Sequence, residues 1–148
     1  MKIVLETLCG CTAPSGFETP AAQAAQALLA PLVDETSIDR MGNLIGVRRC
    51  GKPDAGKVLL DAHLDEIGLI VTGAEEGYLR FRTIGGVDPR MLPGREVTIL
   101  TQPPMVGMVA SPGPEQDDES KSVPIAELVI HAGLTQEQAE QLVGTPMV

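Results

Sequence analysis

The sequence predicts an α/β fold in two parts, a region of helices and strands followed by a small β barrel or sandwich. Residues 21–29 are rich in alanine and glutamine, which favour helices. Residues 58–60 form an apolar run typical of a buried strand. From Gly68 onward, short alternating runs are separated by turns that carry glycine or proline, as in small all-β domains. We therefore place the boundary between the two parts at residues 68–71.

Three helices are expected. Apolar residues within 3–8 recur at near-helical spacing, and the proline and glycine of 13–16 break that pattern. Thr19 can cap a second helix with Pro20 in its first helical position. Residues 135–138 have the pattern of a capping box and begin a short helix that extends to about residue 142.

The strands are expected where apolar and β-branched residues alternate between turns. The turn chemistry of 39–43 and 52–56 precedes the first two of them. The strand-like runs, in chain order, are 44–47, 58–60, 78–83, 96–100, 105–109 and 128–130.

Composition excludes several classes of partner. The net charge of −9 disfavours nucleic acid and anionic membranes, which are bound mainly by clusters of lysine and arginine. No apolar stretch approaches the length of a membrane span, and the opening residues lack the apolar core of a secretory signal, so we expect a cytoplasmic protein. Cys9, Cys11 and Cys50 are expected to be free thiols. The acidic run at 115–119 is interpreted as surface charge rather than a cation site.

The candidate functional site follows the apolar run at 58–60, where His63 and Asp65 stand two residues apart. The carboxyl edge of an open α/β sheet is the usual place for a site. Side chains two apart in a strand point to the same side. A carboxylate beside a neutral imidazole fixes the tautomer that binds a metal ion. The pair alone is a weak signal, because the same spacing occurs without any metal.

Other motifs have simpler interpretations. Ser15, with Gly16 and Glu18, is read as a turn that seats the second helix rather than as a nucleophile, since no histidine is near it in the sequence. Asp88 is expected to cap a turn ahead of Pro89. Gly85-Gly86 lacks the lysine and helix of a phosphate loop.

Several segments together resemble the ordered signatures of the glutamyl and tetrahedral aminopeptidase family. These enzymes are dinuclear metallopeptidases, and some members have been labelled cellulase or endoglucanase. The stretch 123–140 also resembles the family, so the likeness covers essentially the whole chain but only the first part of a family member. The principal motifs are APSGFE at 13–18, DRMGNLI at 39–45, DAHLDEIG at 61–68 and GGVDPRMLPGREV at 85–97.

The resemblance implies a particular architecture. Residues 1–67 would be the opening part of an α/β/α metallopeptidase domain, and residues 68–148 an inserted PDZ-like β-barrel domain. In the family this barrel mediates dimerisation, and the dimers build a dodecamer. The expected partners are therefore a peptide substrate and further copies of the same chain.

The resemblance also implies a chemistry. His63 would be a ligand of one of two divalent ions, zinc or cobalt, and Asp65 the catalytic-site carboxylate that orients it. Glu66 receives no role. His131, the other histidine, stands where the family has an acidic residue, which leaves its role open.

The remaining family ligands have no counterpart in these residues. One histidine cannot hold a dinuclear site, so we expect this chain alone to retain no metal and to be inactive, although the parent protein would be a metal-dependent aminopeptidase. An alternative is a self-association module without catalysis. A glycosidase is disfavoured, because Phe17, Tyr78 and Phe81 are the only aromatic residues available for a sugar cleft.

Overall fold

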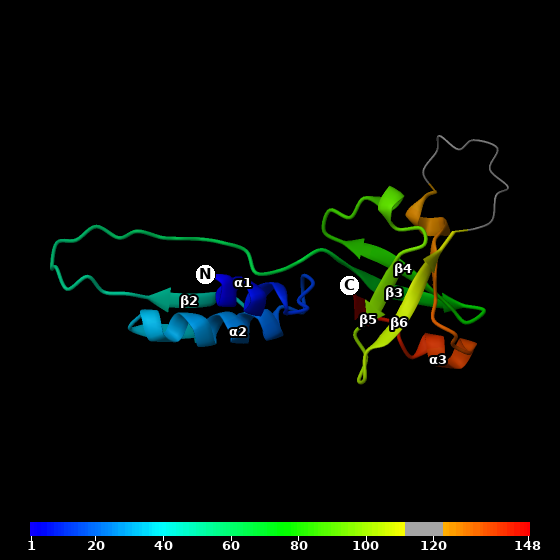
Figure 1. Cartoon of the computed structure of the whole chain (residues 1–148), viewed down its shortest axis with the longest axis horizontal. Coiled ribbons are helices and arrows are strands. Elements are labelled where there is room, and N and C mark those ends of the chain that lie inside the picture. Colours follow the sequence, from blue (N-terminus) through cyan, green and yellow to red (C-terminus); the bar gives the residue numbers. More distant parts are fainter. Residues whose placement is uncertain (112–122) are drawn as a thin grey trace. The chain divides into compact units, whose positions relative to one another are not determined.

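The computed structural model describes residues 1–111 and 123–148 (Figure 1). The chain divides into two compact units, Met1–Glu66 and Ile67–Val148, which are described in turn. The acidic run at 115–119, interpreted above as surface charge, lies outside the described residues. No helix within the described ranges is long and apolar enough to cross a bilayer.

Two helices open the first unit, as the sequence predicts. Helix α1 spans Lys2–Cys9 and helix α2 spans Thr19–Leu29, followed by the short 3-10 helix η1, Ala30–Leu32. The expected cap at Thr19 is wrong, because the helix already includes Thr19 and its N-cap is Glu18. The Glu18 side chain instead accepts a hydrogen bond from the backbone N–H of Gly16 at 2.7 Å, which ties the preceding turn to the helix.

The same unit has a two-stranded antiparallel sheet formed by β1, Glu35–Ile38, and β2, Leu44–Val47. The connecting turn is organised by Asp39, whose carboxylate accepts hydrogen bonds from the backbone of Met41 at 2.8 Å and of Asn43 at 2.9 Å. Strand β2 was expected and is confirmed. Strand β1 was not expected, because its Glu-Thr-Ser-Ile sequence is mostly polar and largely exposed.

The predicted buried strand at 58–60 is wrong in this structure. The run has no strand assignment, and Val58, Leu59 and Leu60 are 86%, 89% and 91% exposed. A buried strand needs a pairing partner and a covering layer. The described residues of this unit provide neither to residues 58–60, since their only sheet is β1–β2.

The second unit is a closed antiparallel barrel, which confirms the expected β region. The strand order is β3-β4-β7-β6-β5-β8. The runs expected at 78–83, 96–100, 105–109 and 128–130 correspond to four of its strands. The bounds are β3 Gly68–Glu75, β4 Tyr78–Ile84, β5 Glu96–Ile99, β6 Met105–Ala110, β7 Val129–His131 and β8 Pro146–Met147.

The barrel encloses an apolar core. Leu79, Ile99, Leu128, Ile130 and Met147 are fully buried. Alternation along each strand directs every second side chain inward, which is why the sequence pattern identified these strands. In β6, Gly107 allows the close approach of Ile130, because a Cβ there would lie 2.6 Å from its Cγ2 atom.

The barrel unit also has short helices. Asp88 is the N-cap of the 3-10 helix η2, Pro89–Met91, and accepts a hydrogen bond from the backbone N–H of Arg90 at 3.0 Å, as expected. The 3-10 helix η3 spans Ile125–Glu127. Helix α3, Gln136–Glu140, begins with the predicted capping box and ends slightly earlier than expected.

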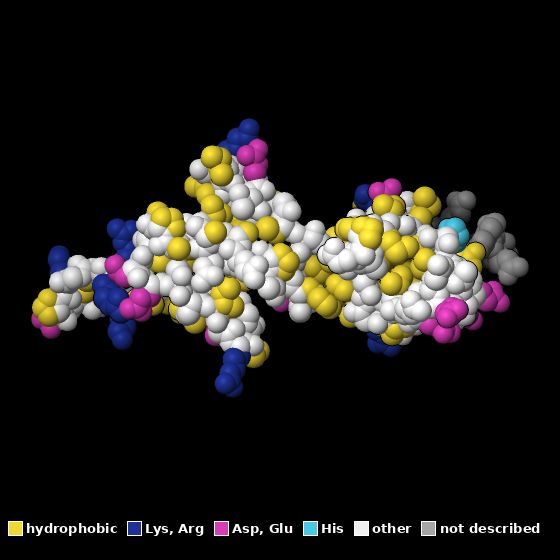
Figure 2. Space-filling view, turned by 90° about the horizontal axis from the view of Figure 1, so that it is seen from below, with side chains coloured by type: hydrophobic (Ala, Val, Ile, Leu, Met, Phe, Trp, Pro, Cys, Tyr) yellow, Lys and Arg dark blue, Asp and Glu magenta, His cyan; other side chains and the backbone are white. Residues whose placement is uncertain are grey.

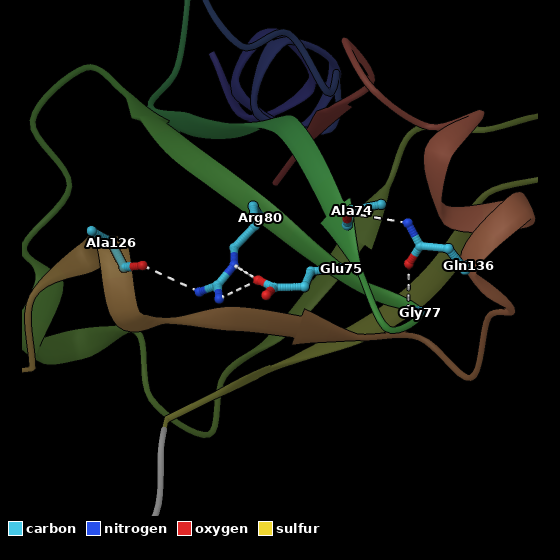
Figure 3. Close-up of polar contacts among 6 residues, drawn as sticks. All are labelled: Ala74, Glu75, Gly77, Arg80, Ala126 and Gln136. Atoms are coloured by element: carbon cyan, nitrogen blue, oxygen red, sulfur yellow. Dashed lines mark hydrogen bonds and ion pairs between the residues drawn. The ribbon is translucent and has the colours of Figure 1, made fainter.

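Helix α3 is linked to the hairpin between β3 and β4 (Figure 3). The Oε1 atom of Gln136 accepts a hydrogen bond from the backbone N–H of Gly77 at 3.0 Å, and its Nε2 donates to the carbonyl of Ala74 at 3.3 Å. On a neighbouring part of the same strands, Arg80 pairs with Glu75 at 2.6 Å and donates to the carbonyl of Ala126 at 3.2 Å.

Candidate functional site

The candidate site lies in the first unit, where the segment containing His63 and Asp65 meets the loop that precedes α2. Two contacts fasten these segments together. The backbone N–H of Glu66 donates to the carbonyl of Ala13 at 3.0 Å, and the N–H of Ala13 donates to the Glu66 carboxylate at 2.8 Å. Pro14 and Glu66 also form an isolated parallel bridge. Glu66, which received no role from the sequence, thus anchors the loop.

The carboxylate of Asp65 is the centre of the site. Its Oδ1 atom lies 3.1 Å from Nδ1 of His63, and its Oδ2 accepts a hydrogen bond from the hydroxyl of Ser15. Each carboxylate oxygen therefore has its own partner. The structure brings His63 and Asp65 together, and it adds Ser15, whose role sequence reasoning missed.

The hydroxyl of Ser15 lowers the pKa of Asp65 below its ordinary value. Partial desolvation opposes this effect, and the contact with His63 adds a smaller lowering. The carboxylate is therefore ionised at neutral pH and available as an acceptor on both oxygens.

The surroundings of His63 favour one tautomer of the neutral ring. Its Nδ1 lies 3.0 Å from the backbone oxygen of Asp65 as well as 3.1 Å from Oδ1, and both of these atoms are acceptors. The network thus assigns the proton to Nδ1 and leaves the lone pair on Nε2. With an 86% exposed side chain, His63 can offer that nitrogen to a ligand outside the protein surface.

A hollow of about 700 Å³ borders the site. Its walls are formed by Glu18, the stretch 41–46 that includes most of β2, and the stretch 59–65. His63 and Asp65 lie on the latter wall. This arrangement gives the pair access to a molecule of moderate size.

Other candidate residues lie elsewhere. His131 is in β7 of the barrel, where its ring is 5.5 Å from that of Tyr78. Asp88 pairs with Arg90 at 2.6 Å, so its carboxylate has a structural partner. Within residues 1–111 and 123–148, no group of three or more His, Cys, Asp or Glu side chains is arranged to hold a metal ion.

Known proteins resemble this chain over most of its length. Residues 42–148 match the sequence profile of the M42 glutamyl aminopeptidase family. The putative aminopeptidase FrvX of Escherichia coli K12 is 31% identical over 136 residues, which cover 88% of this chain and 37% of that protein. The lysyl aminopeptidase of Pyrococcus furiosus is 38% identical over 76 residues, which cover 51% and 21%.

Solved structures resemble it as well. An aminopeptidase from Desulfurococcus kamchatkensis has a TM-score of 0.88 at 32% identity, covering 99% of this chain and 42% of its own. The Pyrococcus horikoshii TET1 peptidase, which can assemble into a tetrahedron or a large octahedral shell, has a TM-score of 0.76 at 29% identity, covering 99% and 46%.

A Thermotoga maritima protein described as an endoglucanase has a TM-score of 0.77 at 28% identity, covering 97% of this chain and 43% of its own. The chain therefore spans less than half the length of each of these relatives.

Proposed function

Because the chain belongs to the M42 glutamyl aminopeptidase family, we propose that it forms part of a metal-dependent aminopeptidase that removes N-terminal residues from peptides. The observation that supports this proposal most directly is the contact of 3.1 Å between His63 Nδ1 and Asp65 Oδ1. It lies within a segment that matches the family.

In the proposed protein, residues 1–67 are the opening part of the α/β/α catalytic domain and residues 68–148 an inserted PDZ-like barrel domain. The division of the chain into two compact units and the closed barrel of the second support this proposal. The exposed apolar run at 58–60 supports it too, because the strand of a larger sheet would have such a sequence and would be covered there.

His63 is proposed as a ligand of one of two divalent ions, zinc or cobalt, with Asp65 as the carboxylate that orients it. The donor set fits in one respect: the His63 side chain is 86% exposed and its Nδ1 faces Asp65, which leaves Nε2 as the nitrogen that could bind an ion. When bound, such an ion polarises a carbonyl and lowers the pKa of its water. Since the described residues offer no cluster of three ligands, we propose that this chain alone retains no metal and is inactive.

A chimera tests the catalytic proposal. The part of FrvX that aligns with this chain is replaced by residues 1–148, and hydrolysis of aminoacyl anilides is measured. The chimera is expected to be active, and His63→Ala to abolish activity without changing assembly. His131→Ala is the matched control, because that side chain lies on the barrel beside Tyr78. Unchanged activity of the His63→Ala chimera would exclude His63 as a ligand.

The metal content of the isolated chain separates the enzyme proposal from a second candidate, a self-association module. The purified chain is dialysed against zinc and then challenged with a chelator. Loss of all zinc is expected. Retention of stoichiometric zinc would contradict the proposal that the site is incomplete. A chain that self-associates normally but gives an inactive chimera would favour the self-association module.

Self-association is proposed to use the barrel. Figure 2 shows apolar side chains gathered over the visible surface of the barrel. The barrel exposes several large ones, namely Met91, Val106, Met108 and Val143. Sedimentation of the isolated chain measures its oligomeric state, and a strictly monomeric chain at all concentrations would contradict this part of the proposal.

Hydrolysis of a glucan is the remaining alternative, since a structural relative is described as an endoglucanase. The aromatic residues do not support it. Phe81 is buried in the barrel core, the ring of Tyr78 lies tilted against that of His131, and Phe17 lies in the loop before α2. Release of reducing sugar by the chimera, in the absence of peptidase activity, would reverse this ranking.

A further inference from the structure

We infer that Ser15 is a positioning residue, which holds the carboxylate of Asp65 and through it the imidazole of His63 in the orientation that presents Nε2 to a metal ion. The inference deepens the proposed function and rests on it for the identity of the ligand. It gives the 13–18 motif a role in the candidate site, in addition to forming the turn that precedes α2.

The geometry of Asp65 carries the inference. Ser15 donates to Oδ2 while His63 Nδ1 lies 3.1 Å from Oδ1. The terminal torsion of an aspartate is broad and nearly two-fold, so a carboxylate with one partner rotates easily. A second partner on the other oxygen removes that freedom. The hydroxyl of Ser15 therefore sets the plane in which Oδ1 faces the imidazole.

Ser15 is itself held firmly. Pro14, next to it, is fully buried and bridges to Glu66. The backbone N–H of Phe17 donates to the carbonyl of Pro14 at 2.8 Å, which closes the turn around Ser15. On the other side, Gly16 adopts a φ of 91° and donates its N–H to Glu18 at 2.7 Å. Contacts on both sides of Ser15 thus hold its backbone in place, and the hydroxyl is held by its hydrogen bond to Asp65.

The same geometry excludes a nucleophilic role in this arrangement. A serine nucleophile needs a base that accepts its proton, and the base is usually a histidine. Here the hydroxyl of Ser15 and the ring of His63 contact opposite oxygens of one carboxylate. Asp65 therefore separates the two groups, and Ser15 acts on His63 only through it.

The experiment uses the 148-residue chain labelled with ¹⁵N. The shifts of Nδ1 and Nε2 of His63 report the share of the neutral ring that carries its proton on Nδ1. Zinc affinity is measured in the FrvX chimera that carries the same substitution, by competition with a chelator. We expect Nδ1–H to predominate. In Ser15→Ala its share falls and zinc affinity falls about tenfold, the size of effect typical for partners of metal ligands.

Further variants separate positioning from a general structural role. Ser15→Thr keeps the hydroxyl and is expected to restore both readouts. Ser37→Ala, at an exposed serine of β1 in the same unit, is expected to change neither. Asp65→Asn is expected to reproduce the effect of Ser15→Ala, and Ser15→Ala added to Asp65→Asn to have no further effect, because the two residues act along one path.

The outcomes distinguish the two proposals. An unchanged tautomer share and zinc affinity in Ser15→Ala, or additive effects in the double variant, would overturn the inference about Ser15 while leaving His63 as a ligand. A tautomer that responds to Ser15→Ala in the chain, together with a chimera whose zinc content does not depend on His63, would uphold the positioning role and overturn the metal assignment. Amide signals of α2 and the barrel check that each variant is folded.

Discussion

The side chain of Gln136 lies across the turn at Gly77, accepting a hydrogen bond from the backbone N–H of that glycine at 3.0 Å. Its amide nitrogen reaches the carbonyl of Ala74 at 3.3 Å and the carboxylate of Glu140 at 2.7 Å. One side chain therefore joins the only α-helix among the described residues of the barrel unit to the β3–β4 hairpin.

Gln136→Ala is expected to lower the free energy of unfolding of the barrel by about 1 to 2 kcal/mol, because it leaves a partly buried N–H without its acceptor. Urea unfolding followed by the fluorescence of Tyr78 measures this, since the chain has no tryptophan and no other tyrosine. Gln141→Ala, at an exposed position just after the same helix, is the control. Equal stability of the two variants would contradict a role for the link.

Gly77→Ala is expected to be more damaging. Gly77 has a φ of 84°, and an added Cβ would lie 2.4 Å from the carbonyl oxygen of Leu134. Strain at a left-handed position alone costs about 1 kcal/mol, and the contact adds to it. Gly133→Ala is the matched control, since Gly133 has a φ of 68° but nothing within 4 Å. The same assay should show the larger loss for Gly77→Ala.

The pair Asp88 and Arg90 provides a prediction about pH. Side-chain hydrogen bonds from Arg90 lower the pKa of Asp88 to about 2. The pKa of Asp88 in the folded chain is below its ordinary value of 3.8. The pair therefore contributes stability above about pH 3.8 and loses that contribution as the pH falls from about 3.8 through about 2. The contribution is small, since both side chains are exposed.

An NMR titration of the Asp88 carboxyl carbon measures this pKa. Arg90→Gln should raise it toward the ordinary value, because the substitution removes both the charge and the forked donors. Arg82→Gln, on β4, controls for the loss of one positive charge from the barrel. A titration midpoint that stays near 2 in Arg90→Gln would show that another group holds the carboxylate.

The sequence predicted four of the six barrel strands, because their burial is settled locally. In β4 and β6, alternate side chains point into a core that neighbouring strands within the same unit complete. Strand β3 was missed because burial does not alternate at its start, where Gly68 and Leu69 are both buried. Strand β8 was missed because it has only two residues and begins with a proline. Pattern reasoning thus works where a strand alternates between buried and exposed side chains and its partners lie in the same compact unit.

The candidate site was predictable in part for the same reason. His63 and Asp65 are two residues apart, so their contact is local in the sequence. Ser15 is fifty positions from Asp65, and a serine before a glycine is also an ordinary turn sequence. The only sequence signal that links Ser15 to Asp65 is that the motifs at 13–18 and 61–68 occur in a fixed order. That order does not predict a contact between the two side chains.

The run at 58–60 leads to the last prediction, which concerns burial rather than chemistry. In the isolated chain Leu60 is 91% exposed, so Leu60→Ser should change the free energy of unfolding by less than about 0.5 kcal/mol. If the run is a buried strand of a larger sheet in the proposed enzyme, the same substitution in the FrvX chimera should cost about 3 kcal/mol or more, because it places a hydroxyl in an apolar core.

Chemical unfolding of both proteins measures the two values. Ser37→Ala, in exposed β1, should have little effect in the isolated chain and serves as the control there. Equal small effects of Leu60→Ser in chain and chimera would show that the run stays exposed, and the hollow beside His63 would then be open to solvent in the enzyme as well.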